Sequence, residues 1–143
     1  MQEFYLAHID GFHIVEPVKI WKLYTTDAYE MDSHYRHFHF RFGNTLKYPN
    51  SLLEDAIKKC SDVVEGLYRE WFLKQLTLTW TKAIASDMET LGYVSEINEQ
   101  RRFYSRYISP NVSKGNRVYV IVSDALRYEV AAELCESLGH NTK

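Results

Sequence analysis

The sequence predicts a mainly α fold, in which a helical bundle over residues 1–110 is followed by the first strand and helix of an incomplete α/β domain over residues 111–143. Three observations lead to this fold class. Apolar residues recur at helical spacing through most of the first part. A polar stretch with Pro and Gly, residues 109–116, interrupts that pattern. A short β-branched run then follows, which is typical of a strand.

Two helices are expected before residue 45. Pro17 suits the first turn of a helix, and the apolar side chains that follow it share one helical face. Asp27 with Glu30 three residues later resembles a capping pair, which predicts the start of a second helix. The aromatic run 35–42 fits helical spacing but also alternates rings with polar residues, so a strand is the alternative. We favour the helix.

The clearest helix signal is the capping box of Ser51 and Glu54, whose side chains satisfy amide groups left free at a helix start. A long apolar stripe follows it and includes Cys60, so Cys60 is expected in the core. Helical spacing continues toward residue 91, where Gly92 is a plausible terminator.

Residues 117–123, Arg-Val-Tyr-Val-Ile-Val-Ser, predict a strand covered on both faces, as in a parallel sheet. Val130, Leu134 and Leu138 then lie at i, i+4 and i+8, which predicts a helix ending at Gly139. An isolated strand with one helix makes a poor sheet, so this unit is expected to need more of a domain.

Composition excludes several classes of protein. With 45% hydrophobic residues in 143, the chain can build one core and is not expected to be disordered. A formal net charge of −2 provides no overall basic field for nucleic acid. Cys60 and Cys135 lack the close spacing of a structural zinc site, and a reducing cytoplasm fits two separate cysteines. Neither a signal peptide nor a membrane span is visible, so no membrane partner is expected.

Asp124 is the most informative candidate site residue. It directly follows the predicted strand, and ligands of open α/β sheets bind at the carboxyl ends of strands. A carboxylate there can coordinate a divalent metal or act as a nucleophile. The alternative is that Asp124 caps the following helix, because Asp is a favoured N-cap residue. Position alone leaves both interpretations open.

Two weaker patterns have structural interpretations that we favour. His34, His37 and His39 form a histidine cluster, but no acid or Cys constellation accompanies it, so packing beside Tyr and Phe is expected instead of metal binding. Residues 35–42 and 101–107 mix cations with rings, as surfaces that bind single-stranded nucleic acid do. Amphipathic elements with their rings packed inward give the same pattern.

A resemblance to a known family adds to this interpretation. Residues 120–131, Val-Ile-Val-Ser-Asp-Ala-Leu-Arg-Tyr-Glu-Val-Ala, resemble the opening motif of the PglZ family, which belongs to the alkaline phosphatase superfamily and occurs in BREX phage-defence systems. Further segments resemble the helical region that precedes the hydrolase domain in PglZ proteins: Gly11-Phe12-His13, Trp21 with Tyr24, residues 31–36, and Arg102-Phe103-Tyr104.

The resemblance implies a metal-dependent phosphatase or phosphodiesterase in which Asp124 is a metal ligand, with zinc as the expected ion. Arg127 and Glu129 belong to the same motif and are candidates for supporting Asp124 or a phosphate, although a solvent-facing or structural ion pair is the favoured interpretation. Ser123 is expected to be a turn residue, because no activating base lies near it in the sequence.

In that superfamily the nucleophile and the remaining ligands follow later in the chain, beyond residue 143. The chain is therefore expected to be an N-terminal part of a cytoplasmic hydrolase and inactive by itself. Its expected partners are the remainder of the hydrolase domain and other BREX defence proteins. The competing hypothesis is a self-contained helical interaction module that contacts other proteins or nucleic acid.

Overall fold

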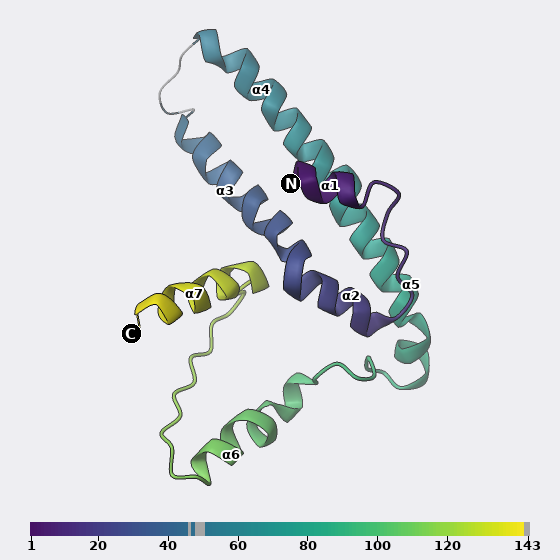
Figure 1. Cartoon of the computed structure of the whole chain (residues 1–143), viewed down its shortest axis with the longest axis vertical. Helices are drawn as coiled ribbons and strands as arrows, with labels where there is room; N and C mark the ends of the chain where they lie inside the picture. Colours follow the sequence, from purple (N-terminus) through teal and green to yellow (C-terminus); the bar gives the residue numbers. More distant parts are fainter. Residues whose placement is uncertain (46, 48–50, 142–143) are drawn as a thin grey trace.

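In the computed structural model, two long helical rods lie side by side and run antiparallel (Figure 1). The structure describes residues 1–45, 47 and 51–141. The first rod consists of α2 (Pro17–Leu23), a π-helical segment (Tyr24–Ala28) and α3 (Tyr29–Thr45). The second rod consists of α4 (Ser51–Glu65), a π-helical segment (Gly66–Leu73) and α5 (Lys74–Thr90).

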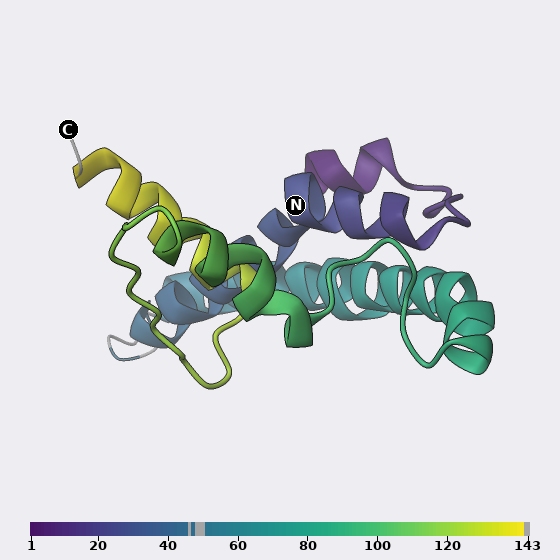
Figure 2. The same ribbon diagram turned by 90° about the horizontal axis from the view of Figure 1, so that it is seen from below.

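Helices α1 (Gln2–Ala7), α6 (Ser109–Val112) and α7 (Tyr128–Asn141) lie outside the two rods. Helix α1 and α2 lie on one side of α5 in the view from below (Figure 2). After α5 the chain forms a smaller helical arm that ends in α6, and then an extended segment returns it to α3. The last helix, α7, packs against α3. The predicted mainly α character is confirmed.

Several predicted helix boundaries are confirmed. Pro17 occupies the first turn of α2, and α4 begins at Ser51. The side chain of Ser51, and with it the predicted capping box, lies outside the described residues. The run 35–42 is helical within α3, which excludes the strand alternative. Gly92 follows the end of α5 with φ of +73°, a conformation that favours glycine at a helix terminus.

Two predicted helix boundaries, one start and one end, are wrong. Asp27 and Glu30 cap no new helix, because the chain remains helical from Pro17 to Thr45 and the earlier turn already supplies carbonyl partners for their amides. Gly139 does not end α7, which continues to Asn141.

The core lies where the two π-helical segments and α1 meet. Its buried residues are Phe12, Ala28, Met31, Tyr68 and Phe72. A π-turn inserts one extra residue per turn and so changes which side chains face the neighbouring helix. Aromatic rings close this core from outside: the Phe4 ring lies 6.0 Å from the Phe72 ring and 6.2 Å from the Trp71 ring.

Cys60 is exposed, so its predicted place in the core is wrong. It lies on the part of α4 beyond the core. In that part Leu53 and Val63 on the same apolar stripe are also mostly exposed. The physical reason is that α3 covers too little of this end of α4 to bury the whole stripe.

One carboxylate is buried beside the aromatic core. Asp32 on α3 accepts a hydrogen bond of 2.6 Å from the hydroxyl of Tyr24 and another from the hydroxyl of Tyr68. Tyr68 also stacks on Tyr35, with ring centroids 3.8 Å apart. Because Tyr24 belongs to the first rod and Tyr68 to the second, Asp32 ties the two rods together.

The predicted strand does not form in the described chain. Residues 116–123 are extended, but they pair with no other segment among the described residues. Tyr119, Ile121 and Val122 are 83%, 92% and 86% exposed. A strand is stabilised by backbone hydrogen bonds to a neighbouring strand, and the described residues supply no such neighbour. No described helix combines the length and the apolar character needed to cross a membrane.

Replacing Phe72 by Ala should lower the free energy of unfolding by about 3 to 5 kcal/mol, because the fully buried ring would leave a cavity between the rods. Phe40→Ala is the matched control, since the Phe40 ring is 71% exposed, and it should change stability by less than about 0.5 kcal/mol. Urea denaturation measures both. Equal losses in the two variants would contradict the assignment of the core.

The two tyrosines that donate hydrogen bonds to Asp32 should ionise at a higher pH than an exposed tyrosine. Burial, followed by the hydrogen bond to Asp32, raises the pKa of Tyr24 and of Tyr68. Since the folded pKa lies above the unfolded value of about 10, this contribution to stability is present below about pH 10 and is lost as pH rises through the higher folded pKa.

Asp32→Asn should therefore shift part of the tyrosinate ultraviolet absorption to lower pH, because the negative charge beside Tyr24 and Tyr68 is removed. Asp62→Asn, which changes an exposed acid on α4, should leave the titration unaltered. A titration that Asp32→Asn does not move would show that the carboxylate does not act on these hydroxyls.

Candidate functional site

Asp124 lies in an exposed turn between the extended segment and α7. The next residue, Ala125, has φ of +57°, which a non-glycine residue adopts at some cost in energy. Helix α7 begins at Tyr128, four residues after Asp124, so Asp124 is not at the N-cap position. Within the described chain its carboxylate has no hydrogen bond or ion pair. The capping interpretation is thus not supported, and the carboxylate is accessible to a ligand.

The described residues do not complete a metal site. No group of three or more His, Cys, Asp or Glu side chains among them is arranged to hold a metal ion. The carboxylate of Asp124 could contribute one ligand, whereas a catalytic zinc takes three protein ligands. A metal at Asp124 would need further ligands from outside the described residues.

Glu129, a candidate for supporting Asp124, lies close to Arg127 and to Arg36 of α3. Glu129 is buried, with 1% of its surface exposed. One of its carboxylate oxygens lies 3.5 Å from Nε of Arg127 and 3.9 Å from Nε of Arg36 on α3. Neither oxygen accepts an aligned hydrogen bond among the described residues. The attraction of Glu129 raises the pKa of the Arg127 guanidinium. The favoured interpretation, a structural ion pair, agrees with this geometry.

A second ion pair extends the contact along α7. Arg36 reaches Glu133 through Nη2 at 2.7 Å, and His37 Nε2 lies 3.5 Å from the same carboxylate. The ion pair with Arg36 lowers the pKa of Glu133. One arginine of α3 thus contacts two acids that are four residues apart on α7.

Tyr128 anchors the start of α7 on the first rod. Its hydroxyl donates a hydrogen bond of 2.9 Å to the backbone carbonyl of Thr25. Its ring centroid lies 5.7 Å from that of Tyr24 and 5.5 Å from that of Tyr29. We call Arg36, Arg127, Tyr128, Glu129 and Glu133 the docking cluster.

Sequence reasoning missed Arg36 and Tyr128 as members of a site. Both fall in segments that resemble the PglZ family, residues 31–36 and 120–131, and that shared membership was the available signal. Nothing in their spacing shows that α3 and α7 meet, because the two segments are separated by more than 80 residues.

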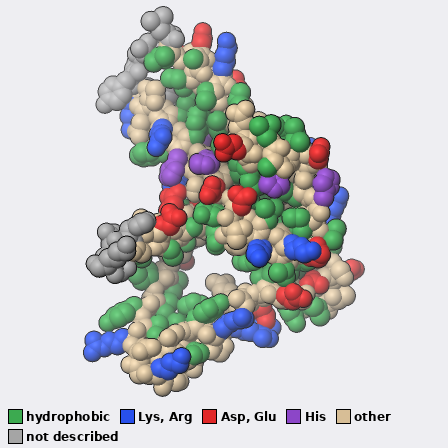
Figure 3. Space-filling model, viewed as in Figure 1, with side chains coloured by type: hydrophobic (Ala, Val, Ile, Leu, Met, Phe, Trp, Pro, Cys, Tyr) green, Lys and Arg blue, Asp and Glu red, His purple; other side chains and the backbone are tan. Residues whose placement is uncertain are grey.

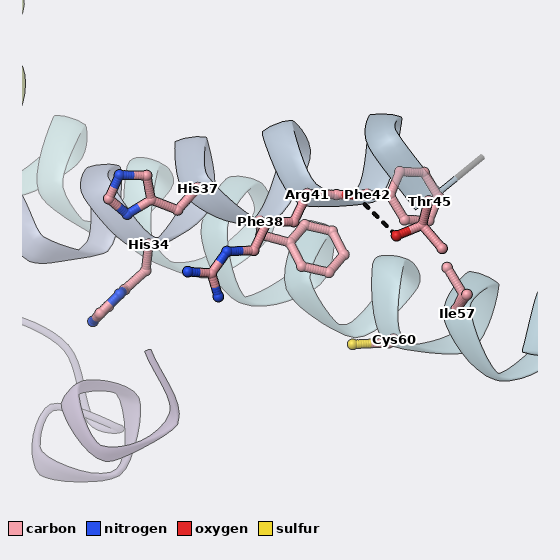
Figure 4. Close-up of a pocket in the computed structure, with 8 residues that line it drawn as sticks. All are labelled: His34, His37, Phe38, Arg41, Phe42, Thr45, Ile57 and Cys60. Atoms are coloured by element: carbon pink, nitrogen blue, oxygen red, sulfur yellow. Dashed lines mark hydrogen bonds between the residues drawn. The ribbon is translucent and has the colours of Figure 1, made fainter. Parts of the chain in front are cut away.

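The three clustered histidines diverge. His37 faces Glu133, whereas His39 Nε2 lies 2.9 Å from Glu65 on the second rod. In Figure 3, histidine and acidic side chains lie next to one another over α3. His34 and His37 also border a groove that Arg41 lines (Figure 4). The packing of His39 beside Tyr35, with centroids 4.3 Å apart, follows the expected pattern.

This groove lies between α3 and α4 and has a volume of about 600 Å³. Its lining is His34, His37, Phe38, Arg41, Phe42, Thr45, Ile57 and Cys60. The lining includes no acidic residue. It is a shallow surface of mixed character that contains neither Asp124 nor the docking cluster.

The second cationic segment is partly neutralised by its neighbours. Arg102 Nε lies 3.0 Å from Glu99, and Arg101 pairs with the same carboxylate. Arg106 donates a hydrogen bond to the side chain of Asn98. The carboxylate of Glu99 reduces the positive field that a nucleic-acid surface needs, whereas Asn98 carries no charge.

Comparisons with known proteins agree with the motif. A family model described as the BREX system PglZ alkaline phosphatase-like domain matches residues 103–143. The chain is 31% identical over 128 residues to the alkaline phosphatase-like protein PglZ of Bacillus cereus (strain H3081.97), and this match covers 90% of the chain and 14% of that protein.

The chain is also 31% identical over 130 residues to the alkaline phosphatase-like protein BrxZ of Escherichia coli O9:H4 (strain HS), covering 89% of the chain and 15% of that protein. No solved structure gives a significant match. The chain thus spans a short part of the length of these relatives, but the similarity extends over nearly all of its own residues, both rods included. On this evidence the chain belongs to the PglZ family.

Proposed function

We propose that this chain is part of a metal-dependent phosphatase or phosphodiesterase of a bacterial BREX defence system, to which it contributes the metal ligand Asp124. The observation that carries the proposal is the state of this carboxylate: it is exposed and unpaired within the described chain, in a turn that the family model covers. An acid held away from the neighbouring arginines remains able to bind a cation.

The exposed apolar run before Asp124 supports a larger domain. Tyr119, Ile121 and Val122 present contiguous apolar side chains to solvent, and such patches on soluble proteins mark surfaces that a partner covers. In the complete protein we expect residues 117–123 to become the first strand of the α/β hydrolase domain. The partner that covers the run is then the remainder of that domain.

The chain is not catalytically complete by itself under this proposal. Under it, the nucleophile and the other metal ligands come from the part of the protein that this chain does not span; the chain covers 14% and 15% of the two relatives. A bound divalent cation, with zinc as the expected ion, would polarise the phosphoryl oxygen and stabilise the charge that develops on it. What the described residues supply is one ligand and the support that places it.

A second function of the rods is association with other BREX proteins. The family description supports such partners in general terms, because it assigns the domain to a BREX system. The groove with His34, Arg41 and Phe42 is the surface on which a nucleic-acid alternative would rest. Arg41 is the one arginine among the described residues that line it, and a single cation favours protein contact over polyanion binding.

Asp124→Ala in the complete protein should abolish hydrolysis of phosphate esters and diesters without lowering its melting temperature, because the carboxylate has no structural partner among the described residues. Turnover of a chromogenic phosphodiester and a thermal melt measure the two effects. Asp62→Ala on α4 is the matched control and should leave both unchanged. Activity retained by the Asp124 variant would refute the assignment.

Removal of metal should have the same effect as loss of the ligand. Dialysis of the complete protein against a chelator should abolish hydrolysis, and added zinc should restore it, since one carboxylate cannot activate the reaction without the cation. Elemental analysis before and after dialysis checks the occupancy. Full activity in protein shown to be free of metal would contradict a metal-dependent reaction.

A further inference from the structure

The start of α7 is fixed on α3 by the most buried charge in the described chain. Glu129 has 1% of its surface exposed and lies between Arg36 and Arg127. Moving a carboxylate out of water carries a large desolvation penalty, which neighbouring charges must offset. Its burial therefore depends on these two arginines.

Three different interactions act on three consecutive residues. Arg127 pairs with Glu129, the hydroxyl of Tyr128 binds the carbonyl of Thr25, and Glu129 faces Arg36. Two of the three connect α7 to the first rod. Such a set fixes both the position and the rotation of the first turn of α7.

Asp124 lies five residues before Glu129, on the same short connection. The intervening Ala125 is held in the left-handed region, so the turn has a defined conformation. On the other side of Asp124, residues 117–123 pair with no strand among the described residues. Within this chain, the position of Asp124 is thus set from the α7 side.

We propose that Glu129 and Arg36 are positioning residues, which hold the turn carrying Asp124 at a fixed place on the helical rods and so set the geometry of the metal ligand. The inference rests on the proposed function, because it assigns a task to these residues in that reaction. The helical rods are then a structural part of the active site, although neither residue touches the substrate.

The test uses the complete protein with Glu129→Gln and Arg36→Met, each of which removes one charge and keeps most of the side-chain volume. Both variants should lose about 10-fold to 100-fold in zinc affinity, measured by calorimetry, and in kcat, with little change in KM. The double variant should lose less than the sum of the two single losses, because both changes break the shared Arg36–Glu129 contact. Arg36→Met also removes the pair with Glu133, and Glu129→Gln removes the pair with Arg127. Arg101→Met is the control, since Arg101 is exposed and pairs with an acid in the helical arm before α6.

Hydrogen exchange separates this proposal from the proposed function. Exchange of the α7 amides should accelerate in Glu129→Gln and Arg36→Met, and Arg36→Lys should restore part of both the protection and the zinc affinity. If Asp124→Ala is inactive while folded Glu129→Gln binds zinc and turns over like the wild type, the positioning role is wrong and the metal ligand stands. If Asp124→Ala is active, the proposed function fails, whatever the exchange shows.

If Glu129→Gln or Arg36→Met fails to fold, the Tyr128→Phe variant tests the positioning role. This change removes only the hydroxyl bonded to Thr25 and keeps the ring against Tyr24 and Tyr29. A fall in kcat and in zinc affinity at an unchanged melting temperature would support positioning. A lower melting temperature with zinc affinity and kcat per folded molecule intact would show a purely structural role and overturn the inference.

Discussion

One face of α3 carries the charges on which the arrangement of the chain depends. Asp32 accepts hydrogen bonds from tyrosine hydroxyls of both rods. Arg36, one helical turn later, pairs with two acids of α7. The two sets interact, because the positive charge of Arg127 lowers the pKa of Tyr68 while Asp32 raises it. Contact between the rods and attachment of α7 are thus parts of one electrostatic arrangement.

Because these charged groups are buried, each is stable only when its partners are in place. The contacts therefore select one arrangement of the helices. An apolar contact tolerates sliding by a fraction of a turn, whereas a buried carboxylate without its partners leaves an uncompensated charge. Among the described residues neither oxygen of Glu129 accepts an aligned hydrogen bond, so proximity to Arg36 and Arg127 is its main compensation. A small rotation of α7 would lose both. The cluster is therefore better suited to fixing one geometry than to adding stability.

Local patterns in the sequence were sufficient for the rods and insufficient for what lies between them. Pro17 and Gly92 mark real helix boundaries because their effects act within a few residues. Cys60 was misplaced because its burial depends on how far a neighbouring helix extends, which periodicity does not encode. The pairing of Arg36 with Glu129 was likewise beyond reach, since it joins segments that only the fold brings together. Asp124 was proposed as a site residue from its position and motif, and only the structure shows that it does not cap α7.

The residues predicted as a strand show why such a segment cannot be judged alone. Val120, Ile121 and Val122 have strong β preference, yet preference without a partner strand leaves backbone groups and apolar side chains in water. Helix α7 has no such requirement, because its own backbone bonds are internal and its polar contacts to α3 are already present. The rods can therefore hold α7 and the Asp124 turn without the sheet. Under the proposed function, a sheet in the complete protein would form against a turn whose position the rods set.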